Sequence, residues 1–156
     1  MATAIAILEF LGESRLPFDL VPHLHTSTSL QSAKAAHIPP KQLAKAVLLE
    51  DHGRLVMAVV LATKHVHLGA LRHQFKRDFG MATEHTVRQT FGDCDPGAIP
   101  PLGGAYGIET LWDDSLMNTE DLYFEAGDHE HLVHVRTENF LELVRECQHG
   151  DFSIPL

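Results

Sequence analysis

The chain has 156 residues, 44% of them hydrophobic and 21% charged, which predicts one globular domain over residues 1–156 with one core. No segment approaches the roughly 18 consecutive apolar residues of a membrane helix, and the start lacks the basic region of a signal peptide, so we expect a soluble cytoplasmic protein. The net charge of −9 argues against a nucleic-acid partner, but the charges are unevenly distributed. Residues 34–88 hold nine basic and four acidic residues, whereas residues 89–156 hold two basic and fourteen acidic residues. This division fits one face that meets phosphates, and it fits two solvated faces equally well.

The first 61 residues are predicted to contain two helices and a hairpin. In chain order, these are a helix over residues 5–12, an extended segment over 17–21, a helix over 30–36, and strands over 46–49 and 55–61. Cap candidates at residues 26–29 precede the second helix, and Pro39-Pro40 ends it. The hairpin turns at Asp51-His52-Gly53, and the apolar run after the turn indicates a central strand buried on both faces.

The remaining chain is predicted to alternate between helices and strands around one irregular loop. In order, we expect helices over residues 69–79 and after Thr83, a loop over 92–104, a meander of strands 107–112, 121–126 and 131–135, and a helix over 138–147. Thr137 is the expected cap of the last helix. These elements predict a mixed α/β domain, in which helices flank a curved, largely antiparallel mixed sheet or pseudo-barrel.

The loop Gly97-Ala98-Ile99-Pro100-Pro101 is the most informative segment. Each proline removes an N–H donor and stiffens the chain around the donors that remain. Such a loop can direct backbone amides at a developing oxyanion, where loss of one donor typically costs about 10²–10³ in rate. The alternative is a stiff connector without a chemical role, and the loop taken alone favours that alternative.

Lys45 lies at the start of the hairpin, between Ala44 and Ala46. The small neighbours leave room for a ligand, and the ammonium could hold a phosphate or a carbonyl as a charged donor. The alternative is a lysine at a strand end that extends into solvent, which propensity alone favours.

Other chemical sites are weakly supported. Cys94 lies between Asp93 and Asp95, which would raise its pKa, so we interpret it as inert. The 12 histidines include three His-x-His pairs, beginning at His23, His65 and His129, but a pair alone does not complete a zinc site. No serine elbow, phosphate loop or dinucleotide fingerprint is present, and neither a metal nor another cofactor is expected.

Over roughly residues 5–147, these features follow the order found in the YbaK/prolyl-tRNA-synthetase-associated domain family, which the chain resembles. The matching segments are Ala33-x-x-Ala36, Ala44-Lys45-Ala46-Val47-Leu48-Leu49, Gly97-Ala98-Ile99-Pro100-Pro101, Asp114-Ser115-Leu116 and Phe124-Glu125-Ala126-Gly127. The resemblance implies the fold of that family and an editing enzyme that hydrolyses the ester of a mischarged tRNA, mostly tRNA(Pro). The alternative is a module with the same fold that binds tRNA or another nucleic acid without turnover.

The resemblance also implies a site. Lys45 matches the functional lysine, and Gly97 and Pro101 match the ends of the G-x-x-x-P loop, which makes Lys45 and Gly97 the expected catalytic positions. In this family the attacking water is thought to be activated largely by the substrate itself. The expected substrate contacts are Ala98, Ile99, Pro100, Pro101, Met57, Leu61 and His129. The expected tRNA contacts, taken from the basic middle segment, are Lys34, Lys41, Lys64, Arg72, Lys76 and Arg77.

Two departures from the family pattern leave the substrate open. Alanine stands at position 46, where some members that clear alanine carry a polar residue, and Ala98-Ile99-Pro100 replaces the more usual glycine-valine-serine. An apolar pocket suits a small uncharged side chain, although it separates such substrates by only about 1–3 kcal/mol per methylene. The expected partner is aminoacyl-tRNA, with prolyl-tRNA synthetase or the elongation machinery as candidate protein partners of a monomer or weak homodimer.

Overall fold

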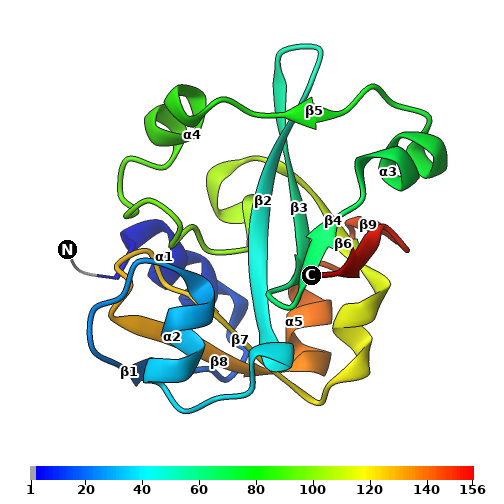
Figure 1. Ribbon diagram of the computed structural model, residues 1–156. Helices are drawn as coiled ribbons and strands as arrows, with labels where there is room; N and C mark the ends of the chain where they lie inside the picture. Colours follow the sequence, from blue (N-terminus) through cyan, green and yellow to red (C-terminus); the bar gives the residue numbers. More distant parts are fainter. Residues whose placement is uncertain (1–2) are drawn as a thin grey trace.

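A long hairpin of β2 (Leu43–Asp51) and β3 (Arg54–Leu61) forms the centre of the fold (Figure 1). The computed structural model describes residues 3–156. His52 and Gly53 both have positive φ, as a two-residue type I′ turn requires. Residues 56–61 are all buried, which confirms the prediction of a central strand covered on both faces. Figure 1 shows that β5 (Gly80–Met81) lies against the turn end of this hairpin.

The main sheet has the strand order β1-β8-β7-β2-β3-β6-β9, with β5 paired to β2. The flanking strands are β1 (Asp19–Pro22), β8 (His131–Arg136), β7 (Asp121–Glu125), β6 (Glu109–Asp113) and β9 (Gln148–Gly150). A separate sheet pairs β4 (Lys64–Val66) with β10 (Ser153–Pro155). The mixed α/β fold class is confirmed, but β1 and β9 are open edges, so the sheet is not a closed barrel.

The predicted three-stranded meander is wrong. β7 and β8 pair as neighbours, whereas β6 runs parallel to β3 on the other side of the hairpin. β7 in turn runs parallel to β2. β6 and β7, which follow one another in the chain, therefore lie on opposite sides of the hairpin. Each pairs in parallel with a strand far away in the sequence, which a tight turn cannot connect.

Five α-helices lie around the sheet. They are α1 (Ile5–Ser14), α2 (Ser29–Ala35), α3 (Leu68–Phe75), α4 (Glu84–Thr90) and α5 (Thr137–Leu143), with short 3₁₀ turns at Pro40–Gln42, Gly103–Tyr106 and Asp114–Asn118. Thr28 and Thr83 cap α2 and α4 through their hydroxyls, as capping preferences predict. None of the described helices has the length and apolar character needed to cross a membrane.

Two helix predictions need correction. α3 ends at Phe75 instead of residue 79, because Lys76 adopts the left-handed conformation with φ 52°. Lys76 and Arg77 therefore lie beyond the helix. α5 ends at Leu143, and Thr137 is its first residue rather than its cap.

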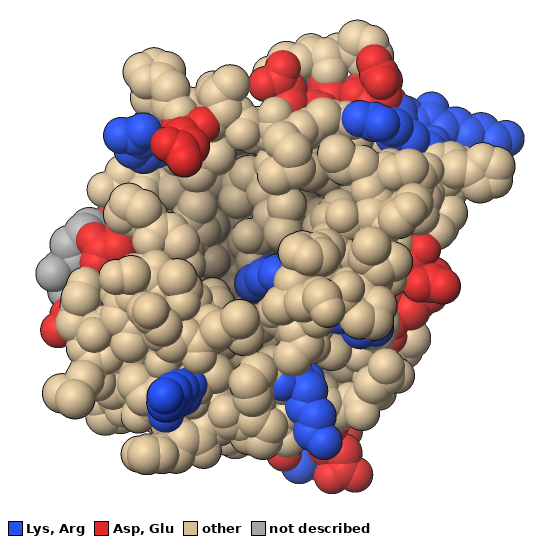
Figure 2. Space-filling view, in the orientation of Figure 1, with Lys and Arg blue, Asp and Glu red and all other residues tan. Residues whose placement is uncertain are grey.

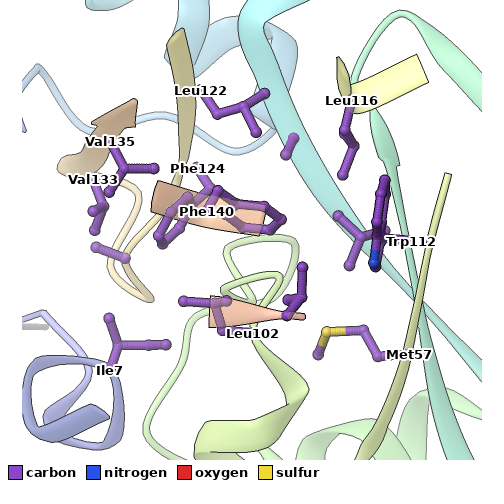
Figure 3. Close-up of a cluster of buried hydrophobic side chains, with 14 of the residues drawn as sticks. Ile7, Met57, Leu102, Trp112, Leu116, Leu122, Phe124, Val133, Val135 and Phe140 are labelled. Carbon is purple, nitrogen blue, oxygen red and sulfur yellow. The ribbon is translucent and has the colours of Figure 1, made fainter. Parts of the chain in front are cut away.

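Alternate residues of β3 belong to two hydrophobic clusters, one on each face of the sheet. Met57, Val59 and Leu61 pack in the larger cluster, whose other members include Phe124 and Phe140 (Figure 3). The intervening Val56, Ala58 and Val60 pack on the other face with Leu71, Phe79 and Phe152. This period of two follows from strand geometry. It places Met57 and Leu61 in the core.

Candidate active site

A cavity of about 420 Å³ opens beside the first residues of β2. Its lining consists of the segment Ser27–Leu30 together with Lys45, Ala46, Ala62, His65, Gly97, Ile99 and Leu156. A second groove of about 660 Å³ shares Ala46, Gly97 and Ile99 with the cavity and extends along apolar residues that include Leu48, Met81 and Val87. Figure 2 shows the hollow near the centre of this face, with most of the visible charged side chains around it. The two spaces adjoin at these three shared residues, and together they are called the depression below.

Lys45 lines the first of these spaces, whereas Arg88, paired with Glu84, lines the second. Lys45 lies on β2 opposite Val60 and is half-buried. Burial lowers its pKa, and no carboxylate among residues 3–156 contributes to that shift. A partly desolvated ammonium without a paired carboxylate can bind a phosphate or a carbonyl oxygen of a ligand.

The loop opposite Lys45 supplies two backbone donors. Within residues 3–156, the N–H of Gly97 and the N–H of Ile99 donate to no protein acceptor, whereas the N–H of Ala98 donates to the carbonyl of Asp95 at 3.1 Å. Gly97 and Ile99 both line the cavity, while Ala98, Pro100 and Pro101 are buried beneath it. The loop therefore has two alternate residues that line the cavity and whose N–H groups remain available to a ligand.

Gly97 is required by both conformation and space. Its φ is +78°, a region that side chains rarely adopt. A Cβ atom at this position would lie 3.3 Å from the carbonyl oxygen of Ser27 and 3.4 Å from Nε2 of His129. The loop therefore packs closely against His129 and against Ser27, in the segment that leads into α2.

His129 lies behind the loop, not in the cavity. Its side chain is buried, its Nε2 lies 2.6 Å from the carbonyl oxygen of Pro96, and its Nδ1 lies 2.6 Å from Oε2 of Glu125. Burial raises the pKa of Glu125 to about 8. Glu125 was not among the predicted site residues, although a carboxylate within the apolar strand Asp121–Glu125 is the signal that could have identified it.

The other predicted contacts fall into separate groups. Met57 and Leu61 belong to the core and do not line the cavity. Lys34 and Lys41 are exposed and Lys64 is half-buried; they lie on α2, on the 3₁₀ turn before β2 and on β4, the elements around the cavity. Arg72, Lys76 and Arg77 lie instead around a shallow depression at the turn end of the hairpin, with Asp51 and His52.

Metal binding and cysteine chemistry gain no support from the structure. Among residues 3–156, no three His, Cys, Asp or Glu side chains are close enough together to hold a metal ion. Burial raises the pKa of the Cys94 thiol to about 12. A thiol with so high a pKa is a poor nucleophile at neutral pH.

Comparison with known proteins identifies a family and a fold. A sequence model of the aminoacyl-tRNA editing domain family matches residues 23–143. No curated protein matches the chain. A solved candidate trans-editing enzyme for prolyl-tRNA synthetase superposes with a TM-score of 0.85 at 18% identity, over 99% of this chain and 98% of that one. A hypothetical protein superposes with a TM-score of 0.84 at 18% identity, over 96% of this chain and 99% of that one.

The same domain also occurs within a longer protein. A candidate signal transduction protein from Marinobacter aquaeolei VT8 superposes with a TM-score of 0.77 at 21% identity, over 96% of this chain but only 30% of that one. At such identities the solved structures establish a shared fold.

Proposed function

The chain belongs to the family of aminoacyl-tRNA editing domains, and we propose that it is a deacylase that hydrolyses the ester between a wrong amino acid and the terminal ribose of a tRNA. The observation that carries this proposal is that a half-buried lysine lines the same cavity as Gly97 and Ile99. Within residues 3–156 this lysine has no carboxylate partner, and the N–H groups of Gly97 and Ile99 have no protein acceptor. Similarity to a candidate trans-editing enzyme for prolyl-tRNA synthetase further suggests tRNA(Pro) as the substrate and action in trans. Such a substrate implies a cytoplasmic location.

In this mechanism, Lys45 and the Gly97 loop position the substrate and stabilise the negative charge that develops on its carbonyl oxygen. Water is the nucleophile. The substrate carbonyl lies between the ammonium and the N–H groups of Gly97 and Ile99. Water attacks the carbonyl carbon, and negative charge grows on the carbonyl oxygen, where these donors stabilise it. The bond to the ribose oxygen then breaks, and that oxygen takes up a proton. A ribose hydroxyl or the substrate's own side chain is the proposed base for the water.

The depression divides naturally between the two parts of the substrate. The part that Lys45, Ser27–Leu30 and Ile99 line is small and holds the amino acid in this proposal. The larger apolar groove along Leu48, Met81 and Val87 then receives the terminal nucleoside. Because apolar contacts separate small side chains by only about 1–3 kcal/mol per methylene, we expect several small uncharged amino acids to be cleared.

A panel of tRNAs charged with correct and incorrect amino acids tests this proposal. The wild-type protein should release a small amino acid from at least one mischarged tRNA, and Lys45→Ala should abolish most of that activity. Lys41→Ala, measured at saturating tRNA, is the matched control, because Lys41 is exposed and lies outside the cavity lining, so its loss should affect tRNA affinity and not the chemical step. Salt-dependent tRNA binding without hydrolysis would instead support the non-catalytic module.

A further inference from the structure

Glu125 and His129 form a buried acid–imidazole pair directly behind the Gly97 loop. Glu125 is the last residue of β7, His129 follows four residues later, and each is only 2% exposed. Within residues 3–156, both carboxylate oxygens of Glu125 and Nδ1 of His129 are buried and make no well-aligned hydrogen bond. Nδ1 approaches Oε2 to 2.6 Å, and the Ser32 hydroxyl is a second polar group beside the Glu125 carboxyl.

The protons of this pair can be assigned from its neighbours. The carbonyl oxygen of Pro96 can only accept, so Nε2 of His129 carries a proton and donates it at 2.6 Å. Nδ1 and Oε2 are also 2.6 Å apart, although they are not aligned as a hydrogen bond. Because two lone pairs at that distance repel each other, the contact requires a second proton. The pair thus holds one proton at Nε2 and one at the contact of Nδ1 with Glu125, called the shared proton below.

Loss of the shared proton would leave one proton for two contacts. If the remaining proton stays on Nε2, the Nδ1 lone pair faces an ionised carboxylate. If it moves to Nδ1, the Nε2 lone pair faces the Pro96 carbonyl oxygen, and the turn into Gly97 must shift. A Cβ atom at Gly97 would lie only 3.4 Å from Nε2, so the imidazole and the loop are in direct packing contact.

We propose that Glu125 is a positioning residue, which holds the Pro96-Gly97 turn in its active geometry through His129 and a shared proton. This inference rests on the proposed deacylase function, because the loop matters only if its amides bind substrate. The carboxylate lies beneath the loop and outside the cavity lining, so it acts through His129 and not on the substrate.

The surroundings keep the proton in place at neutral pH. Burial raises the pKa of Glu125 to about 8; Asp128 in the following turn adds to the shift, and the Ser32 hydroxyl from α2 opposes it. The ring of His25 meets the His129 ring edge-on at 6.1 Å. Asp128 accepts from Nδ1 of His131 and from two backbone amides. The pair supports the loop only while Glu125 is protonated. This support should therefore be lost as the pH rises through about 8.

The decisive experiment compares kcat for Glu125→Gln and Glu125→Met from about pH 6 to about pH 9.5, after subtraction of uncatalysed ester hydrolysis. The amide of Glu125→Gln can donate permanently to Nδ1, so this variant should keep wild-type kcat at neutral pH and lose the decline above pH 8. Glu125→Met has similar volume but no donor. It should lose about 10–100-fold in kcat at every pH, with KM for tRNA unchanged.

Nuclear magnetic resonance provides a readout that does not depend on activity. The amide signals of Gly97 and Ile99 should shift with one common midpoint near pH 8 in the wild type, and with none in Glu125→Gln. Hydrolysis without this common midpoint would overturn the positioning role. The common midpoint without hydrolysis would support the coupling of Glu125 to the loop and overturn the deacylase proposal. A wild-type pH profile retained by Glu125→Gln would also overturn the inference.

Discussion

The two ends of the central hairpin both carry basic side chains, but their charges are used differently. At the turn end, Arg77 pairs with Asp51 and with Glu109, each at 2.7 Å, and Arg72 donates to the carbonyl of Phe79. At the cavity end, about 20 Å away at roughly 3.3 Å per residue, Lys45 has no carboxylate partner among the described residues. A cation that already pairs with protein groups stabilises the fold, whereas an unpaired cation beside a cavity can bind a ligand.

The comparison explains why the positive charge of residues 34–88 does not by itself define a tRNA surface. Half of the predicted tRNA contacts, Arg72, Lys76 and Arg77, belong to the turn end, and two of those three donate to protein groups. We therefore expect the cavity end to dominate substrate binding. Four variants test this difference between the ends.

Lys45→Ala should have the largest effect. Removal of a charged donor from the reacting carbonyl is expected to lower kcat/KM by about 10²–10³, the usual cost of one oxyanion donor. The free energy of unfolding should change by no more than about 0.5 kcal/mol, because the variant breaks no ion pair. Single-turnover deacylation and urea unfolding measure the two quantities. An equal loss of activity in Arg77→Ala would remove the distinction between the two ends.

Gly97→Ala should affect both activity and stability. The alanine must adopt φ +78° and approach the Ser27 carbonyl and the His129 ring, so we expect a cost of about 1–2 kcal/mol in unfolding free energy. Activity should fall as well, since the loop amides move. Gly92→Ala is the matched control, because a Cβ there meets only the Arg88 carbonyl oxygen at 3.9 Å. If Gly97→Ala changed neither the activity nor the unfolding free energy, the loop would not require glycine at this position.

Combined substitution of Lys34, Lys41 and Lys64 by alanine should weaken tRNA binding without changing the chemical step. Each lysine that neutralises a phosphate contributes about 0.7 to the slope of log affinity against log salt for single strands. The slope of the triple variant should fall accordingly, while kcat at saturating tRNA stays at the wild-type value. Filter binding at several salt concentrations provides the measurement, and an unchanged slope would place the tRNA elsewhere.

Arg77→Ala should have the smallest effect, and it should be confined to stability. The guanidinium is mostly covered and contacts two carboxylates, so its loss is expected to cost about 1 kcal/mol or less in unfolding free energy. The affinity for tRNA and its salt dependence should remain at wild-type values. A weaker affinity in this variant, with stability unchanged, would make the turn end part of the tRNA surface.

Local patterns in the sequence were sufficient to predict most elements and to single out Lys45 and the Gly97 loop. The hairpin was predictable because its turn and its apolar run are local signals. The parallel pairings of β3 with β6 and of β2 with β7 were missed, since they join segments far apart in the chain. Lys76 ends α3 through a backbone conformation that its residue type does not signal.

Burial accounts for the remaining differences at the site. Met57 and Leu61 were expected beside the substrate, but a strand covered on both faces places them in the core. His129 was expected to line the pocket, and it supports the loop from the interior instead. Glu125 was identified only as a member of the segment Phe124-Glu125-Ala126-Gly127. Its burial could not be predicted, because it depends on contacts from β8, α2 and the loop, which are not adjacent in the sequence.

The strand order also has a consequence for how the chain folds. The β2–β3 hairpin can form from neighbouring residues, whereas β6 and β7 must be brought to its two sides from about 50 or more residues away, at a loop-closure cost that grows slowly with length. Such non-local pairings are typical of domains that fold in milliseconds to seconds. Hydrogen exchange should therefore be slowest in β2 and β3, which keep neighbours on both edges until the whole domain opens.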